Sequence, residues 1–435
     1  MVKEMRRLGL LLSVFLFAAP ALAQPQAALM PDPGAAPDVE EEEEFGAPIE
    51  LYDPSGRSMA SFHEALRRAD AGEAQARVMV YGASHVAADF FTNVVRQRLQ
   101  TRFGDAGHGF LMPVRPWRTY RHLGGPSVES NRMWTAHRVR ASSRDVTPLG
   151  IAGMAVDADA ASAWGRLDTG TSNAGRFVVH YLLQPEGGSF DLRVDGRRVA
   201  RIPTVSDELG AGVYPVDGLE DGHHTLEVRA RGDGPIRLFG VSVERERAGV
   251  ILDTMGLNGA RAVSHLMWEE GMHQTYLRRL DPSLVVLAYG TNESGDDGHP
   301  IEDYETELWR VLGRIRGTVP NASCLLIGPS DRPMRGSGDE RVDRPRTHQV
   351  IEVQRRVSRA FGCGFFDLVE FSGGPLSMVR WSESEPRYAQ RDLVHFTARA
   401  YIRLGEVLHD AMLAGFDAPV LDAPALNPPV AAGSR

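Results

Sequence analysis

The chain has 435 residues, 43% of them hydrophobic, which is enough for one large core and a further module. Asp and Glu number 57 against 48 Lys and Arg, so the formal net charge is −9 at pH 7. An acidic chain without basic stretches interleaved with aromatic residues does not match a nucleic-acid-binding protein, so we expect no nucleic-acid partner.

The N-terminal residues are typical of a secretory signal peptide. A positively charged start precedes an apolar run at residues 8–19, which is too short to span a bilayer, and residues 21–23 have the small-x-small cleavage pattern. We therefore interpret residues 1–23 as a cleavable signal and expect a periplasmic or secreted protein. No later stretch has the ~20 apolar residues that a membrane helix needs.

The next segment and the C-terminal end have a composition that does not favour folding. Residues 24–50 are rich in proline and alanine and carry a glutamate run at 40–44, so we predict an acidic linker there. Residues 418–435 are again rich in proline and alanine, and we predict a disordered tail.

Two separate stretches, residues 51–124 and 248–417, alternate strand-like and helix-like patterns. The expected strands lie at residues 78–81, 249–252, 284–287, 324–327 and 364–366, and the expected helices at residues 61–71, 91–103, 304–316, 348–361 and 397–412. This alternation predicts an α/β domain with a parallel sheet and helices on both faces.

The middle of the chain, residues 125–247, has a different period. Runs at 177–183, 189–202, 223–230 and 235–244 alternate polar and apolar residues, and Asp195-Gly196 between two such runs is a strong hairpin signal. The sequence therefore predicts an antiparallel β-sandwich inserted into the α/β domain.

Active sites of open parallel sheets lie at the carboxyl ends of the strands, where polar residues follow several of the predicted runs. These residues are Ser84, the stretch 255–259, Asn292, Asp331, and the pair Asp392 and His395.

Three of these residues, Ser84, His395 and Asp392, can together form an activated serine nucleophile. A serine hydroxyl needs a neighbouring base, which His395 can provide, and the imidazole needs a carboxylate to fix its tautomer. Asp392 lies three residues before His395, so both can face Ser84. The expected donors to the oxyanion are the backbone N–H groups of Ser84 and Gly259 and the side-chain amide of Asn292. Gly256 is the alternative to Gly259.

These segments together resemble the SGNH hydrolases, also called GDSL esterases. Residues 82–84 resemble the first sequence block of that family, 256–259 the second, 290–293 the third, and 392–395 the fifth, in the family's order. The resemblance implies a flavodoxin-like three-layer sandwich, with Ser84, His395 and Asp392 as the catalytic residues. Two positions depart from the family's pattern, because Ala83 and Glu293 stand where Asp is usual.

The inserted β region suggests a subgroup of this family. An SGNH domain interrupted at this position resembles the periplasmic peptidoglycan O-acetylesterases, in which the insert is similar to a carbohydrate-binding module. The resemblance implies removal of acetyl groups from a cell-envelope polysaccharide, with no cofactor. The alternatives are a lipase, thioesterase or O-acetyltransferase with the same residues, or a glycan-binding protein with a degenerate catalytic half, which Ala83 keeps open.

Other residues receive more ordinary interpretations. Cys324 and Cys363 lie in separate apolar runs and could pair in an exported protein, but we favour two buried free thiols. His85 is interpreted as a structural residue or a wall of the substrate pocket, and Asp331 as part of a surface loop. No metal-ligand spacing of His and Cys occurs, so we expect no metal.

Tryptophans flank or enter the predicted insert at Trp117, Trp134 and Trp164. Aromatic faces can stack on sugar rings, but a tryptophan in a β-sandwich is more often part of the core. The sequence therefore identifies none of the three as a sugar platform, and it does not determine the oligomeric state.

Overall fold

The computed structural model describes residues 49–139 and 148–417. The predicted signal peptide (1–23), the predicted tail (418–435) and residues 24–48 of the predicted linker lie outside the described residues. Within the two described ranges, no helix combines the length and the hydropathy needed to cross a bilayer.

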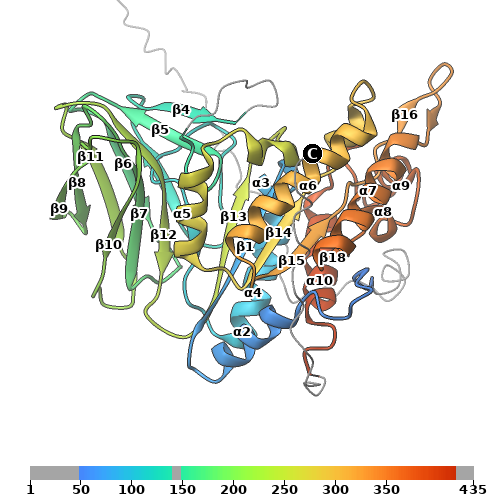
Figure 1. Cartoon of the computed structure of the whole chain (residues 1–435), viewed down its shortest axis with the longest axis horizontal. Coiled ribbons are helices and arrows are strands. Elements are labelled where there is room, and N and C mark those ends of the chain that lie inside the picture. The colour runs from blue at the N-terminus through green and yellow to red at the C-terminus, as the bar shows by residue number, and fades with distance from the viewer. Residues whose placement is uncertain (1–48, 140–147, 418–435) are drawn as a thin grey trace, which may run out of the picture. The chain divides into compact units, whose positions relative to one another are not determined.

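Five parallel strands form the central sheet, drawn in the middle of Figure 1. In spatial order they are β13 (Gly249–Gly256), β1 (Gln75–Gly82), β14 (Leu284–Ala288), β15 (Ser323–Ile327) and β18 (Gly364–Phe366). Counted along the chain, the first strand lies between the second and the third, which is the flavodoxin-like order. The predicted fold class is therefore confirmed.

Side chains of β1 alternate between two hydrophobic clusters, one on each face of the sheet. Val78 and Val80 pack with residues of α2 (Ala60–Asp70), α4 (Phe90–Phe103) and α10 (Ala398–Leu413). Met79 and Tyr81 pack with residues of α5 (Glu270–Leu280), α6 (Ile301–Thr318) and α7 (Pro345–Phe361). Shorter elements complete this part: α3 (Ser84–Ala87), η1 (Ala262–Leu266), η2 (Glu293–Gly295), β16 (Met334–Arg335), β17 (Arg341–Val342), α8 (Leu368–Phe371) and α9 (Ser377–Glu383).

The antiparallel strands β2 to β12 form two further sheets, and β16 and β17 form a small two-stranded sheet. The first has the order β10-β7-β12-β5-β4, with β2 also paired to β12, and the second has the order β3-β6-β11-β8-β9. Their bounds are β2 (Gly109–Leu111), β3 (Ser127–Ser130), β4 (Thr135–Arg138), β5 (Met154–Ala158), β6 (Trp164–Asp168), β7 (Arg176–Leu183), β8 (Ser189–Val194), β9 (Arg197–Pro203), β10 (Gly210–Val216), β11 (Thr225–Ala230) and β12 (Ile236–Glu244). Asp195 (φ 49°) and Gly196 (φ 77°) form the turn between β8 and β9, and positive φ at both positions is what a type I′ hairpin requires.

The antiparallel sheets pack directly against the central sheet. One hydrophobic cluster contains Met79 and Tyr81 of β1 together with the interior of the antiparallel sheets. The hydroxyl of Tyr276 on α5 donates to the backbone oxygen of Tyr181 on β7 at 2.8 Å. β2 pairs with β12 although it lies within the predicted segment 51–124, and the domain boundaries stay a prediction.

The two cysteines form a disulfide, so the expectation of two free thiols is wrong. Their Cα atoms lie 4.6 Å apart. Each cysteine stands one position before the paired residues Leu325 and Gly364 of the neighbouring strands β15 and β18. Parallel pairing therefore places the two sulfur atoms side by side.

A buried ion pair connects β1 to β13. The guanidinium of Arg77 donates to both carboxylate oxygens of Asp253 at 3.0 Å and also contacts Glu244 at the end of β12. Burial raises the pKa of Asp253 above its usual value, and the positive charge of Arg77 opposes this shift. Arg77 therefore supplies the hydrogen-bonding and charge partner of a fully buried carboxyl group where the central sheet meets the antiparallel sheets.

Replacing Arg77 by leucine should lower the free energy of unfolding by about 3–5 kcal/mol, because it leaves a buried carboxylate without its cation. Denaturant unfolding of the full chain measures this change. Arg68→Leu is the control, since that side chain is 57% exposed and 3.9 Å from its partner Glu73. Equal losses in the two variants would contradict a structural role for the buried pair.

Candidate active site

Ser84 stands at the carboxyl edge of the central sheet, as the first residue of α3. The chain turns sharply here, because β1 ends at Gly82, only two residues earlier. A Cβ atom on Gly82 would lie 2.3 Å from Cγ2 of Val86 and 2.8 Å from the backbone oxygen of Ala288. Only glycine permits this turn, which places the half-buried Ser84 at the end of the strand.

His395 and Asp392 lie in a tight turn shortly before α10. Leu393 has a positive φ of 57°, and Oδ1 of Asp392 accepts from the backbone N–H groups of Val394 and His395 at 3.0 Å each. The carboxylate of Asp392 therefore stabilises the turn in which it lies, and it fixes the direction in which the side chain of His395 points.

The structure brings Ser84, His395 and Asp392 into one chain of hydrogen bonds. Nδ1 of His395 is 2.6 Å from Oδ2 of Asp392, and Nε2 of His395 is 2.7 Å from Oγ of Ser84. Partial burial raises the pKa of Asp392, but hydrogen bonds from His395 and Val394 outweigh burial and hold that pKa below its usual value. A carboxylate that accepts from Nδ1–H leaves Nε2 free to accept the serine proton.

The structure places the expected oxyanion donors on neighbouring loops. Gly259 follows β13 with a φ of 78° and is exposed. Nδ2 of Asn292 donates to the backbone oxygen of Ala260 at 2.9 Å, which leaves its second N–H available. Gly256 has a packing role, because a Cβ atom there would lie 2.1 Å from the backbone nitrogen of Ala87.

Glu293 joins the two loops that carry these donors. One carboxylate oxygen accepts from the backbone N–H of Ala262 at 2.8 Å and the other from that of Gly290 at 3.0 Å. Burial raises the pKa of Glu293 above its usual value, and these backbone donors oppose the shift. Its longer side chain, where the family pattern has Asp, thus spans from one loop to the other.

His85 lies behind the site as a buried structural residue. Nδ1 of His85 is 2.7 Å from the hydroxyl of Tyr401, Nε2 is 3.3 Å from Oγ of Ser330, and that oxygen lies 3.4 Å from the backbone oxygen of Val394. Burial, with the nearby His395, lowers the pKa of His85 to about 3, so this ring is neutral. His85 and Ser330 therefore brace the turn that carries His395.

Asp331 is 1% exposed, so its assignment to a surface loop is wrong. Its carboxylate accepts from the backbone N–H of Met378 at 3.1 Å. Burial raises the pKa of Asp331, and the bond from Met378 opposes this. The carboxylate therefore anchors the first turn of α9.

A narrow hollow lies one helical turn from Ser84, and the sequence did not identify it. Its lining comes from the end of α3, the end of β13 with its following loop, and the segment 117–122: Ala87, Trp117, Thr119, Tyr120, Arg121, His122, Thr254, Gly256 and Asn258. The hydroxyl of Tyr120 accepts from the backbone N–H of Met112 at 2.7 Å and lies 2.9 Å from Nε2 of His122. These bonds hold the segment in place. In the sequence, the only indication of this hollow was Trp117, which lies in a segment with several arginines.

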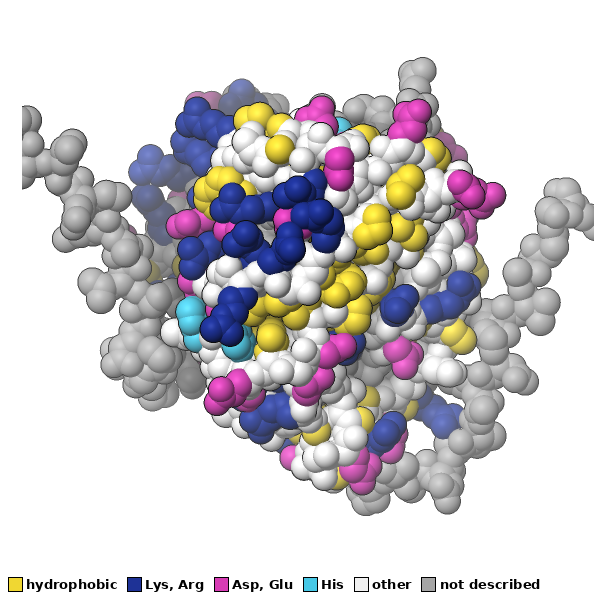
Figure 2. Space-filling view, turned by 90° about the vertical axis from the view of Figure 1, so that its left-hand side faces the viewer, with side chains coloured by type: hydrophobic (Ala, Val, Ile, Leu, Met, Phe, Trp, Pro, Cys, Tyr) yellow, Lys and Arg dark blue, Asp and Glu magenta, His cyan; other side chains and the backbone are white. Residues whose placement is uncertain are grey.

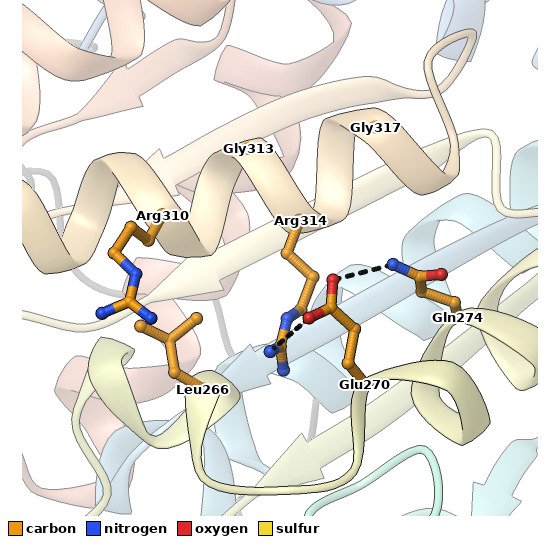
Figure 3. A pocket seen from close by; sticks show the side chains of 7 residues that line it. All are labelled: Leu266, Glu270, Gln274, Arg310, Gly313, Arg314 and Gly317. Carbon is orange, nitrogen blue, oxygen red and sulfur yellow. Dashed lines mark hydrogen bonds and ion pairs between the residues drawn. The ribbon is translucent and has the colours of Figure 1, made fainter. Parts of the chain in front are cut away.

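A second pocket, between α5 and α6, contains none of these residues (Figure 3). Arg314 and Glu270 form an ion pair there at 2.9 Å, and Glu270 accepts from the amide of Gln274 at the same distance. Glu270, Gln274 and Arg314 thus satisfy one another, and the pocket contains neither a nucleophile nor a base arranged for catalysis.

Comparison with protein families identifies residues 226–403 as matching the GDSL-like lipase/acylhydrolase family. No curated protein sequence matches the chain significantly.

Comparison with solved structures gives a match over most of the chain. A peptidoglycan O-acetylesterase shares 25% identity with a TM-score of 0.71, covering 85% of this chain and 99% of that one. A salicylyl-acyltransferase from a tetracycline biosynthetic pathway (17% identity, TM-score 0.29) covers 68% of this chain and 99% of its own. A family two carbohydrate esterase from Cellvibrio japonicus (10% identity, TM-score 0.27) covers 67% and 99%.

Replacing Glu293 by glutamine should destabilise the fold by about 1–3 kcal/mol, because the amide keeps one acceptor oxygen and leaves a buried backbone N–H without a partner. Denaturant unfolding gives this loss, and a parallel fall in the hydrolysis rate of p-nitrophenyl acetate reports displacement of the two loops. Glu302→Gln, at an exposed glutamate in the first turn of α6, is the control. An unchanged free energy of unfolding in Glu293→Gln would show that the two loops do not depend on this carboxylate.

Proposed function

We propose that this chain, which belongs to the GDSL-like lipase/acylhydrolase family and hydrolyses ester bonds, removes O-acetyl groups from cell-envelope peptidoglycan. The reaction takes place outside the cytoplasm, in keeping with the signal pattern of residues 1–23. The hydrogen-bonded chain of Ser84, His395 and Asp392 is the observation that carries the proposal. The 25% identity with a peptidoglycan O-acetylesterase supports the choice of glycan.

The first half of the reaction acylates Ser84. Oγ of Ser84 attacks the acetyl carbonyl carbon while Nε2 of His395 takes the hydroxyl proton. The carboxylate of Asp392 stabilises the imidazolium that forms. The tetrahedral intermediate collapses when the C–O bond to the sugar breaks, and His395 returns the proton to the leaving sugar oxygen.

The second half releases acetate. Water attacks the acetyl-serine carbonyl as Nε2 of His395 takes one of its protons, and collapse of this intermediate returns the proton to Ser84. In both halves the oxyanion accepts hydrogen bonds from the backbone N–H groups of Ser84 and Gly259 and from Nδ2 of Asn292. The N–H of Ser84 suits this role because the first N–H groups of a helix have no partner within it.

The hollow beside α3 has a volume of about 10 Å³, room for about one water molecule, so the sugar ring would lie over its mouth rather than inside it. Trp117 is half-buried there, and the guanidinium of Arg138 lies 5.5 Å from its ring centre. An aromatic face held in this way can pack against the apolar face of a sugar ring. Asn258 on the opposite loop and Arg121 add polar groups for the ring hydroxyls.

Replacing Ser84 by alanine should lower acetate release from O-acetylated peptidoglycan by about 10⁶-fold. Asp392→Asn should lower it by about 10⁴-fold, because His395 then loses the partner that fixes its tautomer. Ser55→Ala, at an exposed serine before α2, is the control.

Three results would contradict this function. Undiminished acetate release by Ser84→Ala would exclude the nucleophile, acyl transfer to a sugar acceptor without free acetate would indicate a transferase, and preference for long-chain esters would indicate a lipase.

Replacing Trp117 by alanine should lower kcat/KM for O-acetylated peptidoglycan, relative to kcat/KM for p-nitrophenyl acetate, by about fivefold, since one aromatic contact contributes about 1 kcal/mol. The physical reason is that the small ester has no sugar ring to pack against Trp117 at the mouth of the hollow. Trp309→Ala, at a tryptophan 39% exposed on α6, should leave this ratio unchanged. Equal losses for both substrates would contradict a sugar-binding role.

A further inference from the structure

The outer face of the sheet β3-β6-β11-β8-β9 carries a cluster of arginines. Along β8, Phe190 and Leu192 point into the sandwich core, so Asp191 and Arg193 point outward. We call this outer surface the arginine face, and its arginines are Arg166, Arg193, Arg198, Arg201, Arg229 and Arg231. Figure 2 looks onto this side of the molecule and shows basic side chains gathered beside a band of hydrophobic ones.

Cross-strand pairing arranges the arginine face in two rows. The first row contains Glu129, Arg166, Glu227, Arg193 and Arg198 on successive strands. The second row contains Trp164, Arg229, Asp191 and Arg201. Directly opposed residues of antiparallel strands lie on the same face of a sheet, so the guanidinium groups line one continuous surface.

Among the residues that the structure describes, the face has four acidic residues, Glu129, Asp168, Asp191 and Glu227, against six arginines, so they do not neutralise it. The single carboxylate of Asp191 is shared by three arginines: Arg198 (3.9 Å), Arg201 (3.0 Å) and Arg231 (3.4 Å). Glu227 is shared in the same way by Arg193 (3.9 Å) and Arg229 (2.5 Å).

The arginine side chains still reach solvent. They are 39–53% exposed at Arg193, Arg198, Arg201, Arg229 and Arg231. Each guanidinium has five N–H donors, so unused donors remain. A positive surface on a chain of net charge −9 favours an anionic partner at this place.

Trp164 indicates what kind of polyanion fits. It lies in the second row beside Arg229 and is half-buried rather than enclosed in the sandwich core. An aromatic ring on a flat surface of guanidinium groups suits a polymer that combines sugar rings with carboxylates. The planar guanidinium fork matches a carboxylate in two parallel hydrogen bonds.

We propose that the arginine face binds the carboxylates of peptidoglycan stem peptides, and so holds the polymer while the site at Ser84 removes its acetyl groups. This inference rests on the proposed function for the identity of the polymer. Several weak contacts of this kind add up, because the first contact raises the local concentration of the next carboxylate. The interaction should weaken as salt rises, since exposed charges are screened.

The test is co-sedimentation of the full-length chain with purified peptidoglycan sacculi. The combined substitutions Arg193→Gln, Arg198→Gln and Arg201→Gln should weaken binding by about tenfold, since three exposed charge contacts contribute about 0.5 kcal/mol each. The control combines Arg68→Gln, Arg98→Gln and Arg356→Gln, whose side chains are 57%, 42% and 55% exposed on other elements. This control should bind as the unsubstituted chain does.

A second arm needs no variant. Sacculi whose carboxyl groups have been converted to amides should bind the unsubstituted chain about tenfold more weakly, for the same reason. Equal binding to native and amidated sacculi would overturn the proposal, as would tighter arginine-dependent binding to phosphatidylglycerol vesicles, which would indicate a lipid surface.

Acetate release from the same sacculi separates the two claims. Binding that depends on the arginines without acetate release would contradict the proposed function and leave the arginine face supported. Acetate release together with equal binding to native and amidated sacculi would contradict the proposed role of the arginine face and leave the proposed function supported.

Discussion

The hydrogen bond of 2.7 Å between Nε2 of His395 and Oγ of Ser84 joins residues 311 positions apart, and the proposed chemistry depends on it. A parallel sheet makes the meeting possible, because its strands all end at one edge. Gly82 allows the chain to turn immediately at that edge, and Asp392 folds the turn that presents the imidazole. The contact between Ser84 and His395 thus depends on the backbone conformation of these two turns rather than on the length of the side chains.

The antiparallel sheets of the sandwich lie in sequence between β1 and β13, two paired neighbours of the central sheet. β1 and β13 pair residue by residue from Gln75 with Gly249 to Gly82 with Gly256, although the whole sandwich lies between them in sequence. Arg77 and a shared hydrophobic cluster fix the sandwich against the central sheet. The position of the sandwich relative to the edge that carries Ser84 is therefore fixed.

Local sequence patterns predicted the five strands of the central sheet, four runs of the antiparallel sheets and the three residues that meet at the edge, but not α5 or the strands β3–β6 and β10. Period-two runs and the Asp195-Gly196 turn appear as strands and a type I′ hairpin because both depend on near neighbours. The disulfide was missed because it depends on which strands are adjacent, and neither Cys324 nor Cys363 carries that information in its own run. The same reason applies to buried Asp331, whose partner Met378 lies on a distant helix turn.

The account stands on Ser84 becoming acylated, and covalent labelling tests this most directly. The full-length chain would be treated with a fluorophosphonate, which reacts with activated serine hydroxyls, and the modified peptide identified by mass spectrometry. The account predicts one phosphonylated residue, Ser84, and loss of esterase activity in proportion to labelling. Esterase activity that persists in fully labelled protein, or a label on another residue with Ser84 unmodified, would contradict it.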